Sequence, residues 1–317
     1  MTGLAAGAER IVIDTDCGFF GDDGTTLVML LRRPGLFRVE AITIVSGNVW
    51  ARQSAGYVRE ILKLLKRPRL PVYLGAQMPL VRTAAMAAAE KDVEFRGAFA
   101  EKQPDRMPAG VRAENAVSYL IRTIEANPGE ITLVGLGPLT NIAMALRLRP
   151  EIAGKIRRLV FMGGQYRVAG NASKAAEFNF WFDPEAAQVV LRSAIREKIM
   201  FGLDVCNKAM LDKPGFDAIA AAGGPIAARF REDFGVRYPG FLNNSAARVS
   251  LWDALVAAWM IEPKLFGSPE NLALDVDSRF GPTYGAVIGG GPGSVTMMID
   301  VNYPKVYEMF RSLMVAR

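Results

Sequence analysis

Residues 11–31 read IVIDTDCGFFGDDGTTLVMLL, which predicts a buried strand followed closely by an apolar helix. Four aspartates lie between them within ten residues: Asp14, Asp16, Asp22 and Asp23. Alternation along the strand puts Asp14 and Asp16 on one side, and the glycines that follow allow a turn that brings the Asp pair back toward them. Four such carboxylates repel one another unless a cation lies among them, and an all-oxygen set favours Ca²⁺ or Mg²⁺ over Zn²⁺. We expect the chemistry at this strand end.

The composition is that of an ordinary globular protein. A chain of 317 residues fits two average domains or one large α/β domain. No linker, repeat or composition break divides it, so we predict a single domain over residues 1–317. The net charge of +6 comes from basic residues scattered over predicted helices. This pattern indicates solvated helix faces, and we expect no nucleic-acid partner.

The two cysteines, Cys17 and Cys206, are far apart and lack the spacing of metal ligands, which is typical of free thiols in a reducing compartment. The first ten residues do not resemble a secretory signal, and no stretch is long and apolar enough to span a membrane. These observations predict a cytoplasmic protein without a membrane partner.

The chain contains no histidine. This absence excludes a Ser-His-Asp or Cys-His nucleophile system, a His-ligated zinc site and a histidine general acid. The remaining candidates for chemistry are carboxylates, amides, aromatic side chains and a metal-bound water.

Short apolar segments alternate with helical stretches along most of the chain, which predicts an α/β fold with a mostly parallel sheet flanked by helices, built around a Rossmann-like core. Residues 86–107 have no clear periodicity, and either a surface loop or a flap over a site explains them. The strands are expected at 11–13, 39–45, 71–74, 131–134, 159–162, 199–203, 273–276 and 295–301, and the helices at 26–32, 54–65, 113–126, 140–148, 184–193 and 304–314, with a mostly helical section over 215–260.

The predicted strands end in small or polar residues. After the acidic cluster, the ends are residues 46–48 (SGN), 135–141 (GLGPLTN), 163–164 (GG) and Asp204. Turn chemistry explains each of these alone. Because parallel strands present their carboxyl ends at one edge of the sheet, the full set indicates a shared ligand pocket.

Two other segments carry polar side chains suited to a ligand. Asn171, Glu177 and Asn179 lie in one predicted loop, and their amides and carboxylate match the hydrogen-bonding needs of a sugar's vicinal hydroxyls. Trp252-Asp253 opens an apolar helix. Asp253 there is either a helix cap or a distant metal ligand, and its position alone does not decide between them.

These residues taken together resemble the inosine-uridine-preferring nucleoside hydrolase family from end to end. The matching motifs, in the family's order, are DTDxG…DD, SGN, PVYLGA, LGPLTNIA, FMGG, GN…AEFN, FDPEAA and GLDV. The resemblance implies an α/β domain that binds one Ca²⁺ in a ribose pocket and hydrolyses the N-glycosidic bond of ribonucleosides to free base and ribose. It also implies a homodimer or homotetramer.

The resemblance implies a role for each matching residue. The Ca²⁺ ligands would be Asp16, Asp23, the backbone carbonyl of Leu136, and Asp253. Asp16 would also take a proton from the attacking water, and Asp14 would support the site from behind. The ribose hydroxyls would be held by Asp22, Asn48, Asn171, Glu177 and Asn179.

Three positions depart from the family pattern. Cys17 stands where many members have proline, and Trp252 and Asn207 stand where members that act on inosine and uridine have histidines. Histidine at the Trp252 position protonates the departing base there, and such general-acid help is worth ~10²- to 10⁴-fold. Trp252 would instead stack on a purine, with Trp181 or Trp50 as further candidates, or it is simply core packing.

These departures leave several functions open. Besides a purine-preferring hydrolase, the chain fits a hydrolase of another N-riboside or a non-catalytic ribose-binding relative. A phosphotransferase with Asp14 as nucleophile ranks behind them because the chain lacks a convincing lysine partner motif.

Overall fold

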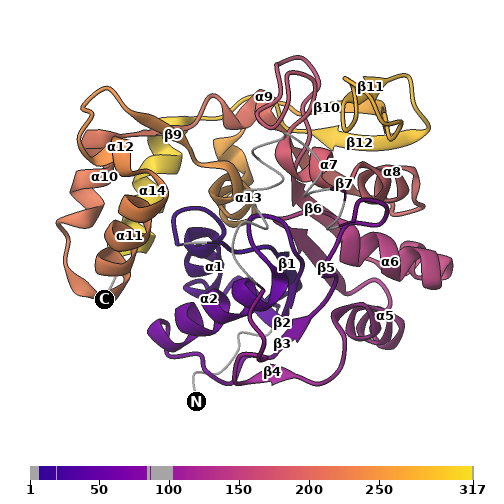
Figure 1. The fold of residues 1–317 in the computed structure, drawn as a ribbon, viewed down its shortest axis with the longest axis horizontal. Coiled ribbons are helices and arrows are strands. Elements are labelled where there is room, and N and C mark those ends of the chain that lie inside the picture. The colour runs from indigo at the N-terminus through magenta and orange to yellow at the C-terminus, as the bar shows by residue number, and fades with distance from the viewer. Residues whose placement is uncertain (1–6, 19, 84–85, 87–102, 316–317) are drawn as a thin grey trace.

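Within residues 7–18, 20–83, 86 and 103–315, which this computed structural model describes, ten strands form one central sheet (Figure 1). Its strands are β1 (Glu9–Thr15), β2 (Phe37–Ile44), β3 (Val72–Leu74), β4 (Val111–Arg112), β5 (Ile131–Gly135), β6 (Arg158–Met162), β7 (Lys198–Phe201), β10 (Glu270–Val276), β11 (Val287–Gly289) and β12 (Gly293–Met297). Their order across the sheet is β11-β10-β12-β7-β6-β5-β1-β2-β3-β4.

Helices cover both faces of this sheet. They are α1 (Asp23–Leu31), α2 (Ala51–Leu64), α5 (Ala116–Ala126), α6 (Thr140–Leu148), α7 (Phe178–Phe182), α8 (Pro184–Arg192), α9 (Leu203–Cys206), α10 (Lys213–Ala220), α11 (Gly224–Arg237), α12 (Pro239–Leu242), α13 (Trp252–Ile261) and α14 (Tyr303–Val315), with two 3₁₀ helices, η1 (Pro150–Lys155) and η2 (Pro263–Leu265). A separate antiparallel pair consists of β8 (Met210–Asp212) and β9 (Arg248–Ser250).

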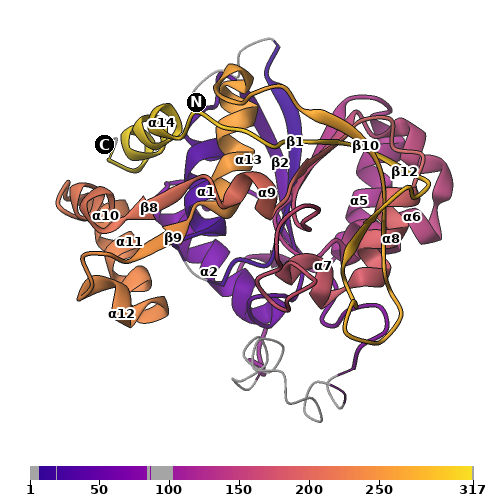
Figure 2. The same cartoon turned by 90° about the horizontal axis from the view of Figure 1, so that it is seen from above.

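Strand β1 is buried on both sides, which explains its unbroken apolar sequence. Ile11 and Ile13 face a core shared with α1, α2, α13 and α14, whereas Val12 faces a second core with α5, α6 and α8. Figure 2 shows these two helix groups on opposite sides of the sheet. Parallel strands need such cover on both faces. The acidic cluster therefore follows a strand in the middle of the molecule.

The strands from β12 to β4 run parallel, and β10 runs antiparallel to both of its neighbours. The prediction of a mostly parallel sheet flanked by helices is confirmed. The carboxyl ends of β1, β2, β5, β6 and β7 consequently meet at one edge, as the strand-end motifs required.

Helices α10, α11 and α12 pack with α14 beside the sheet (Figure 1). Their contact is aromatic: the ring of Phe216 lies 4.8 Å from that of Phe234 and 5.2 Å from that of Phe230, centroid to centroid. Phe230 in turn contacts Phe310 of α14. This phenylalanine core fixes the direction of α11, whose last turn reaches the edge where the acidic cluster lies.

The sequence-predicted elements differ from the structure mainly where elements are short. Strands β4, β8, β9 and β11 were not predicted, because two or three residues carry too little alternation to be recognised. Helix α7 occupies the loop predicted before residue 184. Most of the segment 86–107 lies outside the described residues, so the choice between loop and flap stays open. Within the described ranges, no helix combines the length and apolarity needed to cross a bilayer.

Candidate active site

Five aspartates gather at the carboxyl end of β1. Asp14 lies in β1, Asp16 just beyond it, Asp22 and Asp23 at the start of α1, and Asp253 in the first turn of α13. Helices α1 and α13 pack against each other, which brings together acids that are 230 residues apart in the chain. One carboxylate oxygen from each of Asp22, Asp23 and Asp253 lies within 4.8 Å of the others.

The innermost carboxylates are only half satisfied by protein hydrogen bonds. Asp14 Oδ1 accepts bonds from Thr43 Oγ1 at 2.6 Å and from Asn141 Nδ2 at 2.8 Å. Asp16 Oδ2 accepts one from the amide of residue 48 at 2.7 Å, and Asp23 Oδ1 accepts one from residue 15. The second oxygen of each of these aspartates is buried and has no hydrogen-bond partner within the described part of the chain. Buried anionic oxygens of this kind fit a bound cation.

The raised pKa values of the clustered aspartates also fit a bound cation. Burial raises the pKa of Asp14 to about 7 and the pKa of Asp23 to about 6. Burial together with the charges of neighbouring aspartates raises the pKa of Asp16 and of Asp253 well above the usual carboxyl value. A divalent cation reverses this effect because it favours the ionised form of every carboxylate around it.

Two glycines let the backbone approach Asp16 closely. A Cβ at Gly47 would lie 2.8 Å from both Asp16 Cγ and Pro138 Cδ, and one at Gly137 would lie 2.7 Å from Asp16 Cγ. These distances are too short for any side chain larger than hydrogen. The SGN and LGPLTN motifs therefore supply glycine where the acidic side chain needs room.

Substituting Gly47→Ala is expected to destabilise the protein by about 1–3 kcal/mol, because Asp16 and Pro138 must both shift to admit the methyl group. Thermal unfolding would measure this loss. The matched control is Gly154→Ala, since a Cβ there meets no atom within 4 Å. Equal melting temperatures for both variants would contradict the proposed close approach.

A cavity of about 260 Å³ opens above the cluster. It brings together residues from five separate segments that the sequence analysis had selected. Asn48 follows β2, Leu136 follows β5, and Asp22 and Asp253 come from the acidic cluster. The sequence-predicted residues that line it are Asp22, Asn48, Leu136, Asn171, Glu177, Asn179, Trp252 and Asp253.

Asp14, Asp16 and Asp23 do not line this cavity, and each is at most 2% exposed. The predicted Asp cluster is thus divided between a buried layer and a cavity wall. Asp22 belongs to the wall and is half-buried. Its Oδ1 accepts a hydrogen bond from the amide of Asp253 at 3.2 Å, which joins the two helices at the cavity.

The loop before α7 forms the opposite wall. Glu177 caps α7 by accepting bonds from the amides of Asn179 at 2.9 Å and Phe180 at 3.1 Å, and burial raises its pKa to about 7. Asn179 Nδ2 donates to the carbonyl of Leu136 at 3.1 Å. That carbonyl keeps a second lone pair, so this bond is compatible with a ligand role. Asn171 Oδ1 accepts from the amide of residue 178 at 2.9 Å and so holds the loop.

The aromatic lining differs from expectation. Trp252 is half-buried and faces the cavity, together with Phe178 and Tyr238. Trp181 and Trp50 are not among the cavity-lining residues. Trp181 is instead packed in a small core, where the Arg82 guanidinium lies 4.1 Å from its ring centroid.

Sequence reasoning missed Arg237 and Tyr238, which reach the cavity from the end of α11. Arg237 lies close enough to lower the pKa of Asp22, although burial dominates and leaves that pKa raised to about 8. Asp233, one turn earlier, accepts a hydrogen bond from the amide of Phe20 at 3.1 Å and ties α11 to the acidic loop. No local pattern in the sequence signals this placement, because it depends on the phenylalanine core.

The family model for the inosine-uridine preferring nucleoside hydrolases matches residues 11–308. The chain belongs to this family. Among curated relatives, the pyrimidine-specific ribonucleoside hydrolase RihA of Salmonella enteritidis PT4 is 34% identical over 303 residues, which cover 93% of this chain and 94% of the relative.

Solved structures of nucleoside hydrolases share the fold of the present chain. An inosine-guanosine nucleoside hydrolase superposes with a TM-score of 0.82 at 24% identity, covering 96% of this chain and 98% of that one. A purine-preferring ribonucleoside hydrolase from Gardnerella vaginalis gives a TM-score of 0.78 at 24% identity, with 97% and 98% covered. The family membership makes the chain an N-glycosyl hydrolase of ribonucleosides, so the phosphotransferase and binding-only hypotheses are set aside.

Proposed function

We propose that the protein hydrolyses ribonucleosides in a Ca²⁺-dependent reaction and prefers purine bases. The observation that carries the Ca²⁺ proposal is the set of buried carboxylate oxygens without hydrogen-bond partners in the described chain, directly beneath an amide-lined cavity. All donors are oxygens, which suits a hard cation. The residues that would hold the ion are Asp16, Asp23, Asp253 and the carbonyl of Leu136.

A bound Ca²⁺ supplies positive charge that makes a coordinated water more acidic. Asp16 would accept a proton from the attacking water, and the backbone amide of Asn48 holds the Asp16 carboxylate in place. Asp14 lies behind it and is fixed by Asn141. The resulting negative surroundings favour the positive charge that develops on the sugar ring as the glycosidic bond breaks.

The ribose hydroxyls are held by the polar residues of the cavity wall, namely Asp22, Asn48, Asn171, Glu177 and Asn179. Their carboxylates and amides accept and donate as a diol requires. Holding the sugar on both sides also positions its anomeric carbon, which removes much of the entropic cost of the attack.

The leaving base meets aromatic side chains and no histidine. Trp252, Phe178 and Tyr238 line the cavity, and a bicyclic purine gains more contact with such faces than a pyrimidine. We propose that stacking on Trp252 makes the purine ring more basic, so that solvent can protonate it. The chain has no histidine to act as the general acid for a poorer leaving group.

A pyrimidine preference is the second candidate, because Arg237 and Tyr238 also line the cavity. Both side chains can donate hydrogen bonds to the oxygen of a departing pyrimidine. The relative in Salmonella enteritidis is named as pyrimidine-specific, which supports testing this alternative directly.

Trp252→Ala is expected to lower purine nucleoside hydrolysis by about 10- to 100-fold, whereas Trp252→Phe is expected to retain most activity. Stacking requires an aromatic face but does not require the N–H group of the indole ring. Free base released from inosine, guanosine, adenosine, uridine and cytidine in the presence of Ca²⁺ measures this. Turnover of uridine and cytidine alone, lost in Arg237→Ala and kept in Trp252→Ala, would favour the pyrimidine alternative. Release of no base from any of the five would contradict both preferences.

A homodimer or homotetramer stays a prediction by resemblance, and a cytoplasmic location stays a prediction from the sequence. Sedimentation of the purified protein would measure the first.

A further inference from the structure

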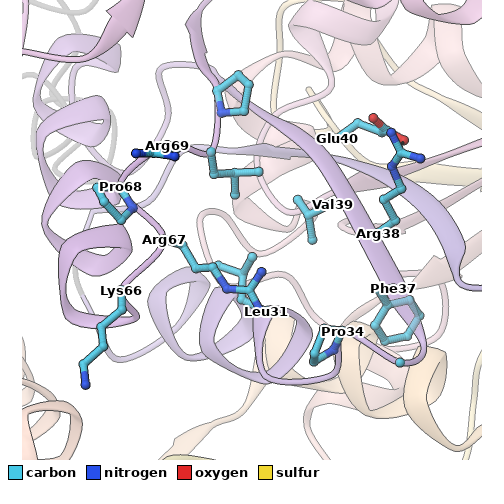
Figure 3. A pocket seen from close by; sticks show the side chains of 13 residues that line it. Leu31, Pro34, Phe37, Arg38, Val39, Glu40, Lys66, Arg67, Pro68 and Arg69 are labelled. Atoms are coloured by element: carbon cyan, nitrogen blue, oxygen red, sulfur yellow. Dashed lines mark ion pairs between the residues drawn. The ribbon is translucent and has the colours of Figure 1, made fainter. Parts of the chain in front are cut away.

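A second pocket lies at the opposite end of the sheet from the acidic cluster. It is formed where β2 and β3 begin, between the α1–β2 turn and the α2–β3 loop, and its volume is about 720 Å³ (Figure 3). This size falls within the range of small-molecule sites. Because the acidic cluster follows the carboxyl end of β1, an occupant here leaves the catalytic cavity free.

The floor of this pocket is apolar and its rim is cationic. Leu31 and Phe37 contribute buried side chains to the floor, with 6% and 4% exposed. The rim carries Arg38, Lys66, Arg67 and Arg69, and Glu40 is the one acidic residue among the lining residues. Such a combination is suited to an anion that also has an apolar part.

The single carboxylate does not neutralise the rim. Glu40 Oε1 is shared between Arg38 at 3.0 Å and Arg10 at 2.6 Å. In the described part of the chain, Lys66, Arg67 and Arg69 form no ion pair. In Figure 3 the Arg67 side chain extends across the pocket toward Leu31, whereas Lys66 points outward at the edge. Arg67 is therefore the cation best placed to meet a ligand.

The loop that carries these cations is held from behind. Arg59 of α2 donates hydrogen bonds to the carbonyls of Pro68 at 2.9 Å and Leu70 at 3.4 Å. Because these bonds fix the loop backbone, the basic side chains extend from an ordered loop, and less conformational entropy is lost when a ligand binds.

Lys66 occupies a position that favours glycine. It ends α2 with φ of 56°, and it is the only non-glycine residue with positive φ among those described. The amide of Lys66 donates to the carbonyl of Lys63 and that of Arg67 to Leu62, which is the glycine-type helix ending called a Schellman motif. A cation after a helix C-terminus has a modest stabilising effect, but glycine would satisfy this backbone better. Lys66 therefore adopts this backbone conformation at an energetic cost.

From these observations we propose that this pocket binds a small phosphorylated molecule with an apolar or aromatic portion. The guanidinium of Arg67 pairs with the phosphate, Lys66 adds positive charge at the rim, and the apolar portion covers Leu31 and Phe37. Arginine matches the geometry of phosphate through paired N–H donors.

The test measures binding of 1-naphthyl phosphate to the full-length protein, with the fluorescence of the naphthyl group as the readout. It is expected to bind at least about tenfold more tightly than inorganic phosphate, because the naphthyl ring covers the apolar floor. Arg67→Gln is expected to weaken its binding at least about tenfold and to leave nucleoside hydrolysis unchanged. The charge-matched control is Arg147→Gln on the exposed face of α6, which should bind like the unmodified protein.

Lys66→Gly separates the binding role from a structural one. It is expected to raise the melting temperature, because glycine relieves the positive φ, and to weaken binding of 1-naphthyl phosphate. Equal affinity for 1-naphthyl phosphate and inorganic phosphate, or unchanged affinity in Arg67→Gln, would overturn the proposal. Arg67-dependent binding of a polyglutamate peptide without binding of 1-naphthyl phosphate would also overturn it, in favour of an acidic macromolecule.

Discussion

Asp16→Asn is expected to lower the turnover of the best nucleoside substrate by about 10²- to 10⁴-fold at saturating Ca²⁺, the range typical of a lost general base. Asparagine has nearly the same shape, so it fits between Gly47 and Gly137 and keeps the acceptor for the amide of Asn48. It cannot take up a proton at neutral pH. Initial rates of base release, measured on protein of verified fold, test this expectation.

The same substitution is expected to lower turnover but to raise the unfolding temperature, so a loss of turnover cannot be attributed to misfolding. In Ca²⁺-free buffer at neutral pH, Asp16→Asn is expected to unfold at a higher temperature than the unmodified protein, because one acid fewer crowds the buried cluster. Asp217→Asn makes the same chemical change on the surface, where Asp217 pairs with Lys213 at 2.6 Å, and should leave turnover unchanged. A variant at position 16 that retains turnover within threefold would rule out Asp16 as the base.

Removing Ca²⁺ with EGTA is expected to abolish hydrolysis and to lower thermal stability. An ion present at 100 times its dissociation constant stabilises the folded state by about 2.7 kcal/mol. Differential scanning calorimetry with and without EGTA measures the loss, and added Ca²⁺ should restore both properties. Full activity and an unchanged melting temperature in EGTA would contradict the proposed metal dependence.

The Ca²⁺-free protein should also show an unusual pH dependence. The folded-state pKa of Asp14 is about 7 and that of Asp23 is about 6, both above the ordinary value near 3.8. The folded protein therefore holds more protons than the unfolded chain between about pH 4 and pH 7. The contribution of these two carboxyls to the free energy of unfolding is fully present below pH 4 and is lost as the pH rises through this window. Saturating Ca²⁺ should flatten the dependence, because the carboxylates are then already ionised.

Much of the sheet and of the polar wall of the cavity was predictable from the sequence, for physical reasons that can be named. Strand β1 is buried on both faces, so its apolar run is unbroken, and the SGN and LGPLTN segments follow strands whose carboxyl ends share an edge. Asp253 was ambiguous because a lone aspartate near a helix start also serves as a cap. The packing of α1 against α13 places it beside Asp22.

The wall that carries Arg237 and Tyr238 was the part of the cavity that local sequence could not predict. Arg237 and Tyr238 carry no motif, and their position depends on how α11 packs through Phe230 and Phe234. Trp181 was a reasonable stacking candidate by composition, but it lies in a core that the sequence does not distinguish from a cavity. Contacts between segments far apart in the chain determine that Arg237 and Tyr238 line the cavity and that Trp181 does not.

Helix α11 is joined to the acidic loop by the hydrogen bond from the amide of Phe20 to Asp233 and to α2 by the ion pair between Arg229 and Glu60 at 3.0 Å, and it packs on its phenylalanine core. In the proposed enzyme, the parts that hold the sugar and the ion lie at strand ends of the central sheet and at the starts of α1, α7 and α13, whereas part of the wall that meets the base lies at the end of α11. Substitutions in the α11 part of the wall can therefore leave the residues that hold the sugar and the ion unchanged. Substitutions along α11 can change which base is accepted while the bond-breaking machinery stays intact, which makes this helix the natural place to redesign selectivity.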